Sequence, residues 1–404
     1  MTSIDRQSVL PLGRWAAAAL FFINGFVVGS WAPQIPNFVS RLGISELTFG
    51  LLVLGFGLGA LLAMTVAGQM VARIGSRRTL RLFALPVIVI LPIVALTSNV
   101  WVAAVVLVLF GGAIGGMDVA MNANVVAVER QLGRAIMSSS HGFWSLGGFT
   151  GGALGGVAIQ AFGPVNHAMA VAAVAAIVVA LVHSHIAEDG IQPRRDERNH
   201  FTIPRQPTIY IVGAMALLSM SAEGSVLTWS ALYLQRELIA NTATAGFAFA
   251  AFSGTMALTR FGGDSIRNRF GAVATFRLSG IIAALGMLVV GLSPWPWLAI
   301  AAFAFCGIGL ANVAPILFST AGNQPGLNAG VSMSVVTTMG HSGILLAPSI
   351  IGFVGGQFGL AAVYIGVAVL MGVISLLAGK TAAADAARRT AGRIAHTILA
   401  QPLD

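Results

Sequence analysis

Charged residues are scarce in this chain of 404 residues. Asp, Glu, Lys and Arg together make up 9% of the sequence, whereas 57% of the residues are apolar and the mean hydropathy is +0.88. A water-soluble globule of this size would have too little polar surface to cover its exterior. The composition therefore excludes an ordinary soluble domain and predicts that lipid surrounds most of the protein.

Cysteine is almost absent as well. Cys306 is the only one, so no intrachain disulfide can form and thiol redox chemistry is not expected. His141 and His341 have no other ligand-type residue at metal-ligand spacing, which argues against a metal site. The sequence shows no nucleophile with a base partner and no nucleotide-binding loop. We therefore expect neither an enzyme nor a cofactor.

Basic residues outnumber acidic ones by 22 to 13, and the net charge is +9. A nucleic-acid partner would need these residues clustered on one exposed face, but their distribution follows the membrane helices instead. Nineteen of the 22 fall in segments on one side, only Arg41 and Arg236 fall on the other, and Arg260 lies within a span. Because cations beside membrane helices favour the cytoplasm, both termini are predicted to be cytoplasmic and no nucleic-acid partner is expected.

Apolar runs of about 20 residues recur along the chain, and each is long enough to cross the ~30 Å hydrocarbon core as a helix. The predicted spans are 14–38, 47–72, 80–98, 100–128, 135–162, 164–186, 207–235, 244–266, 274–293, 296–321, 329–358 and 360–379. The first run carries Pro33 and Pro36 and has a counterpart in the second half, so we expect it to be retained and not cleaved as a signal peptide. The fold class predicted is an all-α membrane protein with twelve transmembrane helices.

The chain also repeats its own pattern. Arg73, Gly75 and Arg81 recur 196 positions later, as Arg269, Gly271 and Arg277. His141 recurs 200 positions later as His341, and the pair Gly155 and Gly156 recurs as Gly355 and Gly356. Duplication within strongly apolar sequence is characteristic of secondary transporters, whose halves rock around a site near the bilayer midplane. The twelve helices are therefore predicted to form two pseudo-symmetric six-helix bundles.

The predicted bundles comprise residues 1–186 and 207–380. Between them, 187–206 is polar and lacks an apolar period, as expected of a cytoplasmic linker. A cytoplasmic tail, 381–404, completes the chain, and its segment 386–399 fits either a short amphipathic surface helix or a disordered tail. We expect the protein to be a monomer.

Two rows of glycines at every fourth position run along the span 135–162. They are Gly147, Gly151 and Gly155, and Gly148, Gly152 and Gly156. Such rows let helix backbones approach closely. They favour tight packing without ligand contact; the alternative is that they give smooth helices that slide when the bundles rock.

The loop after the second span contains Gly68, Arg73, Gly75, Arg77 and Arg78. It resembles the signature loop of the major facilitator superfamily, in which a glycine, an acid, basic residues and a second glycine alternate. This chain has Ala72 where the family has its acid. Together with the two sets of six spans, the resemblance covers the whole chain and implies a gating role for this loop.

A weaker copy of the loop in the second half comprises Asp264, Arg269 and Gly271. Arg260 lies one turn before Asp264, close enough to pair with it on one helix face. This pair either latches the cytoplasmic side or neutralises two charges at the membrane edge.

Three segments refine the resemblance. They are 29–36 (GSWAPQIP), 118–130 (DVAMNANVVAVER) and 138–148 (SSSHGFWSLGG). They look like the YbjJ-type branch of bacterial inner-membrane facilitators, which is itself similar to fucose-permease-like proton symporters. In those symporters, carboxylates in spans one and four are linked to proton coupling. Here span four has Asp118, whereas span one offers Asn24.

Asp118 and Glu223 lie well inside apolar runs. A charge at the centre of a membrane helix costs roughly 2.5–3.5 kcal/mol on insertion scales, so such residues persist where they face a cavity or a partner. Asp118, Asn122 and Glu129 fall on one helical stripe. We predict that both acids couple transport to protons; the alternative is that they are protonated or hydrogen-bonded and only organise packing.

Other polar and aromatic residues inside the spans are candidates for substrate contact. They are Asn24, Trp31, Asn122, His141, Trp229, Asn312 and His341. Amides, imidazoles and aromatic faces suit a sugar-like or other small polar solute. The histidines fit packing between helices equally well, and the tryptophans fit anchoring at the membrane interface.

The sequence thus favours a secondary transporter that moves a small solute with a proton. Drug/proton antiport is the second hypothesis, but such antiporters usually have a basic residue in span four and a glycine-proline signature in span five. Span four here has no Arg or Lys, and Gly148 stands where that proline would be. A non-transporting membrane sensor with the same fold is the third hypothesis, because a fold alone does not fix function.

Overall fold

The computed structural model describes residues 3–132, 136–188, 204–327 and 329–385. The described chain is helical, without β-strands, as the sequence predicts. The predicted tail segment 386–399 and most of the predicted linker, 189–203, lie outside these residues.

The first half of the chain forms α1 to α7. These elements are α1 (Ser3–Trp31), η1 (Ala32–Gln34), α2 (Ile35–Leu42), α3 (Glu46–Ile74), α4 (Ser76–Leu96), α5 (Val100–Leu132), α6 (Met137–Phe162) and α7 (Pro164–Val182). Pro33 and Pro36 break the first span into α1, the short η1 and α2 because proline cannot donate a helical hydrogen bond.

The second half forms α8 to α14. These elements are α8 (Pro207–Arg236), α9 (Thr242–Phe270), α10 (Ala272–Leu292), α11 (Pro296–Leu310), α12 (Val313–Gly322), α13 (Ala329–Phe358), α14 (Leu360–Leu376) and η2 (Leu377–Asp385). Among the described residues, ten helical segments are long and apolar enough to span a membrane. The other two long helices, α6 and α9, are richer in glycine and polar residues.

Each half folds into its own bundle with the same internal arrangement. In the first bundle α1 packs on α6, α3 on α5, and α4 on α5 and α7; in the second, α8 packs on α13, α9 on α11, and α10 on α11 and α14. The backbone repeats as well: Gly75 and Gly271 each form a one-residue turn with φ of +85° and +84°, a conformation that disfavours any side chain. The internal repeat in the sequence is thus a repeat in structure.

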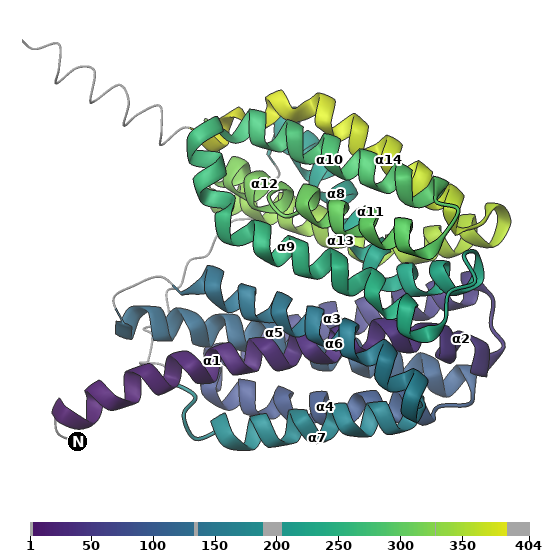
Figure 1. The fold of residues 1–404 in the computed structure, drawn as a ribbon. Coiled ribbons are helices and arrows are strands. Elements are labelled where there is room, and N and C mark those ends of the chain that lie inside the picture. Colours follow the sequence, from purple (N-terminus) through teal and green to yellow (C-terminus); the bar gives the residue numbers. More distant parts are fainter. Residues whose placement is uncertain (1–2, 133–135, 189–203, 328, 386–404) are drawn as a thin grey trace, which may run out of the picture.

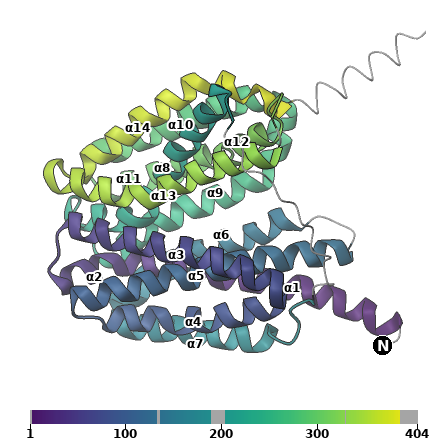
Figure 2. The same cartoon turned by 180° about the vertical axis from the view of Figure 1, so that it is seen from behind.

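The two bundles meet along two helix pairs, α6 with α9 and α3 with α13. They converge at the end that contains α2 and diverge toward the end where the N-terminus lies (Figure 1), and the view from behind shows the same arrangement (Figure 2). We call these the closed end and the open end. Across the closed end Arg236 pairs with Glu46, and the backbone N–H of Ala243 donates to Gln160 Oε1 at 3.0 Å.

The two glycine rows of α6 face different partners. A Cβ on Gly147 or Gly151 would meet the backbone of α1, so this row packs within the first bundle. A Cβ on Gly156 would lie 2.8 Å from the carbonyl oxygen of Thr242 in α9, and Gly152 likewise packs on Ala250. The second row therefore makes a backbone contact between the bundles, which both hypotheses about these rows require.

We predict that Gly156→Leu opens the closed end. Forcing a side chain into this contact costs about 1–3 kcal/mol, and each 1.4 kcal/mol is roughly a tenfold change in the population of the closed state. The measurement is the rate of disulfide formation between cysteines at Gln160 and Ala243 in a Cys306→Ser background, which should fall about tenfold.

Gly366→Leu is the matched control, because nothing lies within 4 Å of a Cβ at this α14 position. It should leave the cross-linking rate unchanged. Equal rates in both leucine variants would show that the glycine row does not control closure.

Candidate functional site

A cluster of polar residues from both bundles lies between them, around the middle of α5, α8 and α13. Its members are Asp118 and Asn122 of α5, His141 of α6, Glu223 of α8, Arg260 of α9 and His341 of α13. Below we call these six residues the central cluster. All six were predicted site residues, but the sequence placed Arg260 at a cytoplasmic gate and not among them.

Hydrogen bonds connect the members that come from the first bundle. The Asn122 amide nitrogen donates to Asp118 Oδ1 at 3.2 Å and to the Asp118 carbonyl oxygen at 2.9 Å. On its other side, Asn122 Oδ1 lies 3.1 Å from His141 Nε2. The spacing of four residues on α5 places Asp118 and Asn122 on one face, as the helical stripe in the sequence predicts.

Electrostatic contacts connect the cluster across the bundles. Asp118 lies close enough to His341 of α13 to interact with it electrostatically, and His141 does the same with Arg260 of α9. Arg260 in turn lies 3.9 Å from the Glu223 carboxylate. Titratable groups of the two bundles thus lie within electrostatic range of each other.

The cluster is accessible to solvent in this conformation. His141 and His341 are exposed, and the side chains of Glu223 and Arg260 are 33% and 30% exposed although they lie deep within apolar helices. Charged groups at this depth are tolerated where water or a partner reaches them. The open end therefore gives access to the site.

A proline in the second bundle helps to position Arg260. Pro315 lacks an N–H, so the carbonyl of Ala311, four residues earlier, loses its helical donor at the break between α11 and α12. Arg260 Nε donates to that carbonyl at 3.4 Å. The prediction from sequence missed this role, although a proline within the span 296–321 was the available signal.

Asn312 lies at the same break, at the N-cap position of α12, where its side chain makes no capping hydrogen bond. Its side chain is 8% exposed and fills the space left by Gly263 of α9, where a Cβ would lie 2.1 Å from Asn312 Oδ1. In this conformation Asn312 thus packs against α9, on the helix that carries Arg260. Substrate contact by Asn312 stays a prediction.

Asn24 is 1% exposed, and its side chain joins three helices. Trp144 Nε1 of α6 donates to Asn24 Oδ1 at 2.9 Å, and Asn24 Nδ2 donates to the Ile114 carbonyl of α5 at 3.3 Å. Both ends of the amide therefore have protein partners. The geometry gives Asn24 a packing role in the state described, and no cluster residue takes the place of the span-one carboxylate.

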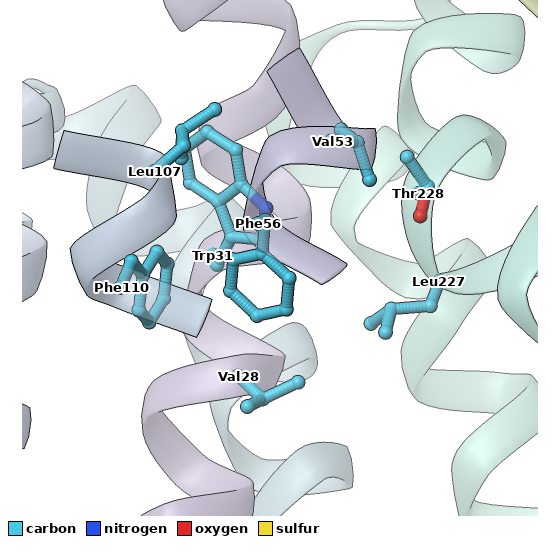
Figure 3. Close-up of a pocket in the computed structure, with 8 residues that line it drawn as sticks. All are labelled: Val28, Trp31, Val53, Phe56, Leu107, Phe110, Leu227 and Thr228. Carbon is cyan, nitrogen blue, oxygen red and sulfur yellow. The ribbon is translucent and has the colours of Figure 1, made fainter. Parts of the chain in front are cut away.

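The two tryptophans predicted for substrate contact differ in position. Trp229 is fully buried, packs edge-on against Phe49 of α3 at 5.1 Å, and belongs to the closed end. Trp31 lines a small cavity between the bundles, shown in Figure 3. The other lining residues are Val28, Val53, Phe56, Leu107, Phe110, Leu227 and Thr228. Neither tryptophan is an exposed interface anchor.

The remaining acids with described side chains have structural roles at helix ends. Glu129 accepts hydrogen bonds from the backbone N–H groups of Ile136 and Met137, and Glu237 and Asp385 do the same for the first residues of α14 and α10. Glu46 and Glu188 form ion pairs with Arg236 and Arg77. Glu129 is thus a helix cap, whereas Asp118 and Glu223 are the acids that face the central cluster.

The predicted gating loop lies at the open end and contacts its own bundle. Arg77 pairs with Glu188 and donates to the Ser184 carbonyl, so it holds the segment after α7. Gly75 forms the turn between α3 and α4, Arg73 is exposed, and nothing lies within 4 Å of a Cβ on Gly68. The predicted partner of Arg260, Asp264, has a side chain outside the described part of the structure. A gating role for these residues stays a prediction.

Comparison with known sequences places this geometry in a family. A sequence model of the Major Facilitator Superfamily matches residues 17–348. An uncharacterized MFS-type transporter of Yersinia pestis is 33% identical over 373 residues, which cover 92% of this chain and 96% of the relative. The uncharacterized transporter y4wD of Sinorhizobium fredii is 32% identical over 338 residues, which cover 83% of this chain and 89% of the relative.

Solved structures share the fold at low sequence identity. A mutant of nucleoside transporter NupG superposes with a TM-score of 0.75 at 13% identity, covering 91% of this chain and 99% of the other. The D-xylose-proton symporter gives a TM-score of 0.69 at 12% identity, covering 90% and 96%. With the fold, the internal repeat and the family match in agreement, the chain belongs to the Major Facilitator Superfamily and is a multi-pass membrane transporter of that type.

Proposed function

We propose that this protein moves a small polar solute across the bacterial inner membrane by alternating access, coupled to a proton. The observation that supports this most directly is the central cluster. It brings ionisable groups from both bundles into one solvent-accessible site. A change in the protonation or ligand contacts of one of these groups therefore alters the interaction between the bundles. A transporter needs such a link between ligand, proton and bundle movement.

The packing of the bundles fits one state of such a cycle. Contacts between the bundles gather at the closed end, while the cluster is accessible from the open end. Described cations such as Arg73, Arg78 and Arg269 lie at the open end, where cytoplasmic residues are expected. These observations support our proposal of an inward-facing state with both termini in the cytoplasm.

Asp118 is the better candidate for the proton site, and Glu223 for a switch. Glu223 faces the guanidinium of Arg260, which compensates its charge. Asp118 has an amide and an imidazole as its neighbours and no fixed cation among the described contacts. A carboxylate without a fixed counter-charge gains more from binding a proton when water withdraws from it.

The solute class follows from the donors and acceptors of the cluster. His141, His341 and Asn122 offer groups that hydrogen-bond to hydroxyls, and the formal charges of Asp118, Glu223 and Arg260 leave no excess cation to bind an anion. A neutral, hydroxyl-bearing solute fits this arrangement. Fold neighbours are named for nucleosides and for D-xylose. We propose in addition that the chain belongs to the YbjJ-like branch near the fucose-type symporters, which fits such a solute.

Proton coupling is tested with Asp118→Asn in proteoliposomes that take up radiolabelled D-xylose or uridine. An inward proton gradient should drive accumulation in the unmodified protein. Accumulation should be lost in the variant, because the amide binds no proton. Flux of the solute down its own concentration gradient should persist, because the amide oxygen still accepts the hydrogen bond from Asn122.

Glu223→Gln serves as the comparison in the same assay. It leaves Arg260 without its carboxylate and should lower the rate of both modes of transport by about tenfold or more. Gradient-driven accumulation that survives in Asp118→Asn would contradict the assignment of the proton site, and absence of saturable uptake of either solute would contradict the solute class.

Orientation is tested with single cysteines in a Cys306→Ser background. Ser98→Cys lies in the exposed loop between α4 and α5 at the closed end, and Ala72→Cys is exposed at the open end. A membrane-impermeant maleimide added to intact cells should label the cysteine at position 98 alone, and both after the membrane is permeabilised. Labelling of the cysteine at position 72 in intact cells would reverse the assigned topology.

A further inference from the structure

The cavity around Trp31 lies between the bundles, on the closed side of the central cluster. Val28 and Trp31 come from α1, Val53 and Phe56 from α3, Leu107 and Phe110 from α5, and Leu227 and Thr228 from α8 (Figure 3). No residue in this set is ionisable. We call this cavity the aromatic pocket.

The aromatic pocket adjoins the central cluster along two helices. Leu227 follows Glu223 by four residues on α8, which is one turn or about 6 Å along the axis. Phe110 precedes Asp118 by eight residues on α5, or about 12 Å. The axial separations are therefore comparable with the length of a nucleoside, and the cavity itself is small in this conformation, about 40 Å³.

Flat aromatic walls define the shape of the pocket. Phe110 packs edge-on against Trp31 with ring centroids 6.0 Å apart, and against Phe56 at 5.2 Å. Trp31, Phe56 and Phe110 border a space that Leu227 and Thr228 of the other bundle also line (Figure 3). Aromatic faces of this kind favour a flat ring as a ligand because stacking adds to the burial of apolar area.

Two polar atoms interrupt the apolar lining. The Trp31 indole nitrogen and the Thr228 hydroxyl make no hydrogen bond within the described part of the chain. The indole N–H donates only, and a hydroxyl both donates and accepts. An uncharged ring that carries an oxygen or nitrogen acceptor satisfies both, whereas a charged group would find no partner here.

We propose that the transported solute is bipartite, with a hydroxyl-bearing sugar part in the central cluster and a flat, neutral ring in the aromatic pocket. Nucleosides and aryl glycosides share this chemistry. The inference rests on the proposed function, since it assigns the second half of the same transport site. Because the pocket is lined by α1, α3 and α5 from one bundle and α8 from the other, a bound ring contacts both.

Matched pairs of solutes test the inference by their dissociation constants for the purified protein. The pairs are uridine with D-ribose and phenyl β-D-xyloside with D-xylose, so that each pair differs by the ring alone. The ring-bearing member of at least one pair should bind about tenfold more tightly, the size of one stacking contact. Tighter binding of uridine than of D-ribose would indicate nucleosides as the ligand class, and tighter binding of phenyl β-D-xyloside than of D-xylose would indicate aryl glycosides.

Variants assign that gain to the pocket. Trp31→Ala should abolish the difference within the pair, whereas Trp31→Phe should keep most of it because a ring face remains. Thr228→Val should weaken uridine, which has carbonyl acceptors, more than phenyl β-D-xyloside, whose ring has none. Trp101→Ala is the control, since Trp101 is 79% exposed on the outer surface of α5.

The outcomes separate this inference from the proposed function. If the free sugars bind and are transported but the ring adds nothing, the aromatic pocket is not part of the site and the proposed function stands. A ring effect that persists in Trp31→Ala would also overturn the inference. If no probe binds and none is transported, both the inference and the proposed solute class fail. A thermal unfolding transition like that of the unmodified protein shows that each variant is folded.

Discussion

The cost of placing charge in hydrocarbon governs this structure. An ionised group in the middle of a membrane helix is tolerated where water or a partner reaches it, and backbone groups must be satisfied within the protein. Most acids with described side chains accordingly lie at helix ends, where Glu129, Glu237 and Asp385 cap backbone N–H groups. Asp118 and Glu223 instead face the contact between the bundles. The same constraint that keeps charge out of most of each helix leaves these two acids where the two halves face each other.

The closed end combines one buried aromatic contact, Trp229 of α8 on Phe49 of α3, with contacts that are more easily reversed. The glycine row of α6 brings two backbones together without interlocking side chains, and a partly exposed ion pair joins Glu46 to Arg236. Exposed ion pairs contribute about 0–1 kcal/mol, and smooth backbone contacts are mainly dispersion and packing. A transporter has to populate both states, so their free energies have to lie within a few kcal/mol of each other.

Proline and glycine place the polar groups as much as the polar residues themselves do. Pro315 frees the Ala311 carbonyl, and Arg260 binds it, which fixes the guanidinium near Glu223. Gly263 leaves room for Asn312 at the same break. The central cluster therefore depends on an interrupted helix in the second bundle and on an unbroken α5 in the first. The repeat in the chain produces the common scaffold, and these departures from symmetry give each half its own part of the site.

The sequence by itself determined that lipid surrounds the protein, that the fold is helical and that it contains a repeat. Apolar run length and the displacements of 196 and 200 residues can be read directly from the order of residues. It also singled out Asp118, Asn122, His141 and His341 as polar residues in apolar spans. The tertiary structure alone decided which of them meet. Asn24 became a packing amide, Arg260 paired with Glu223 across α8 and α9, and Trp31 joined an aromatic pocket. Such outcomes depend on how helices from distant parts of the chain rotate and approach one another, and helical periodicity gives the face of each helix but not the neighbour that this face meets.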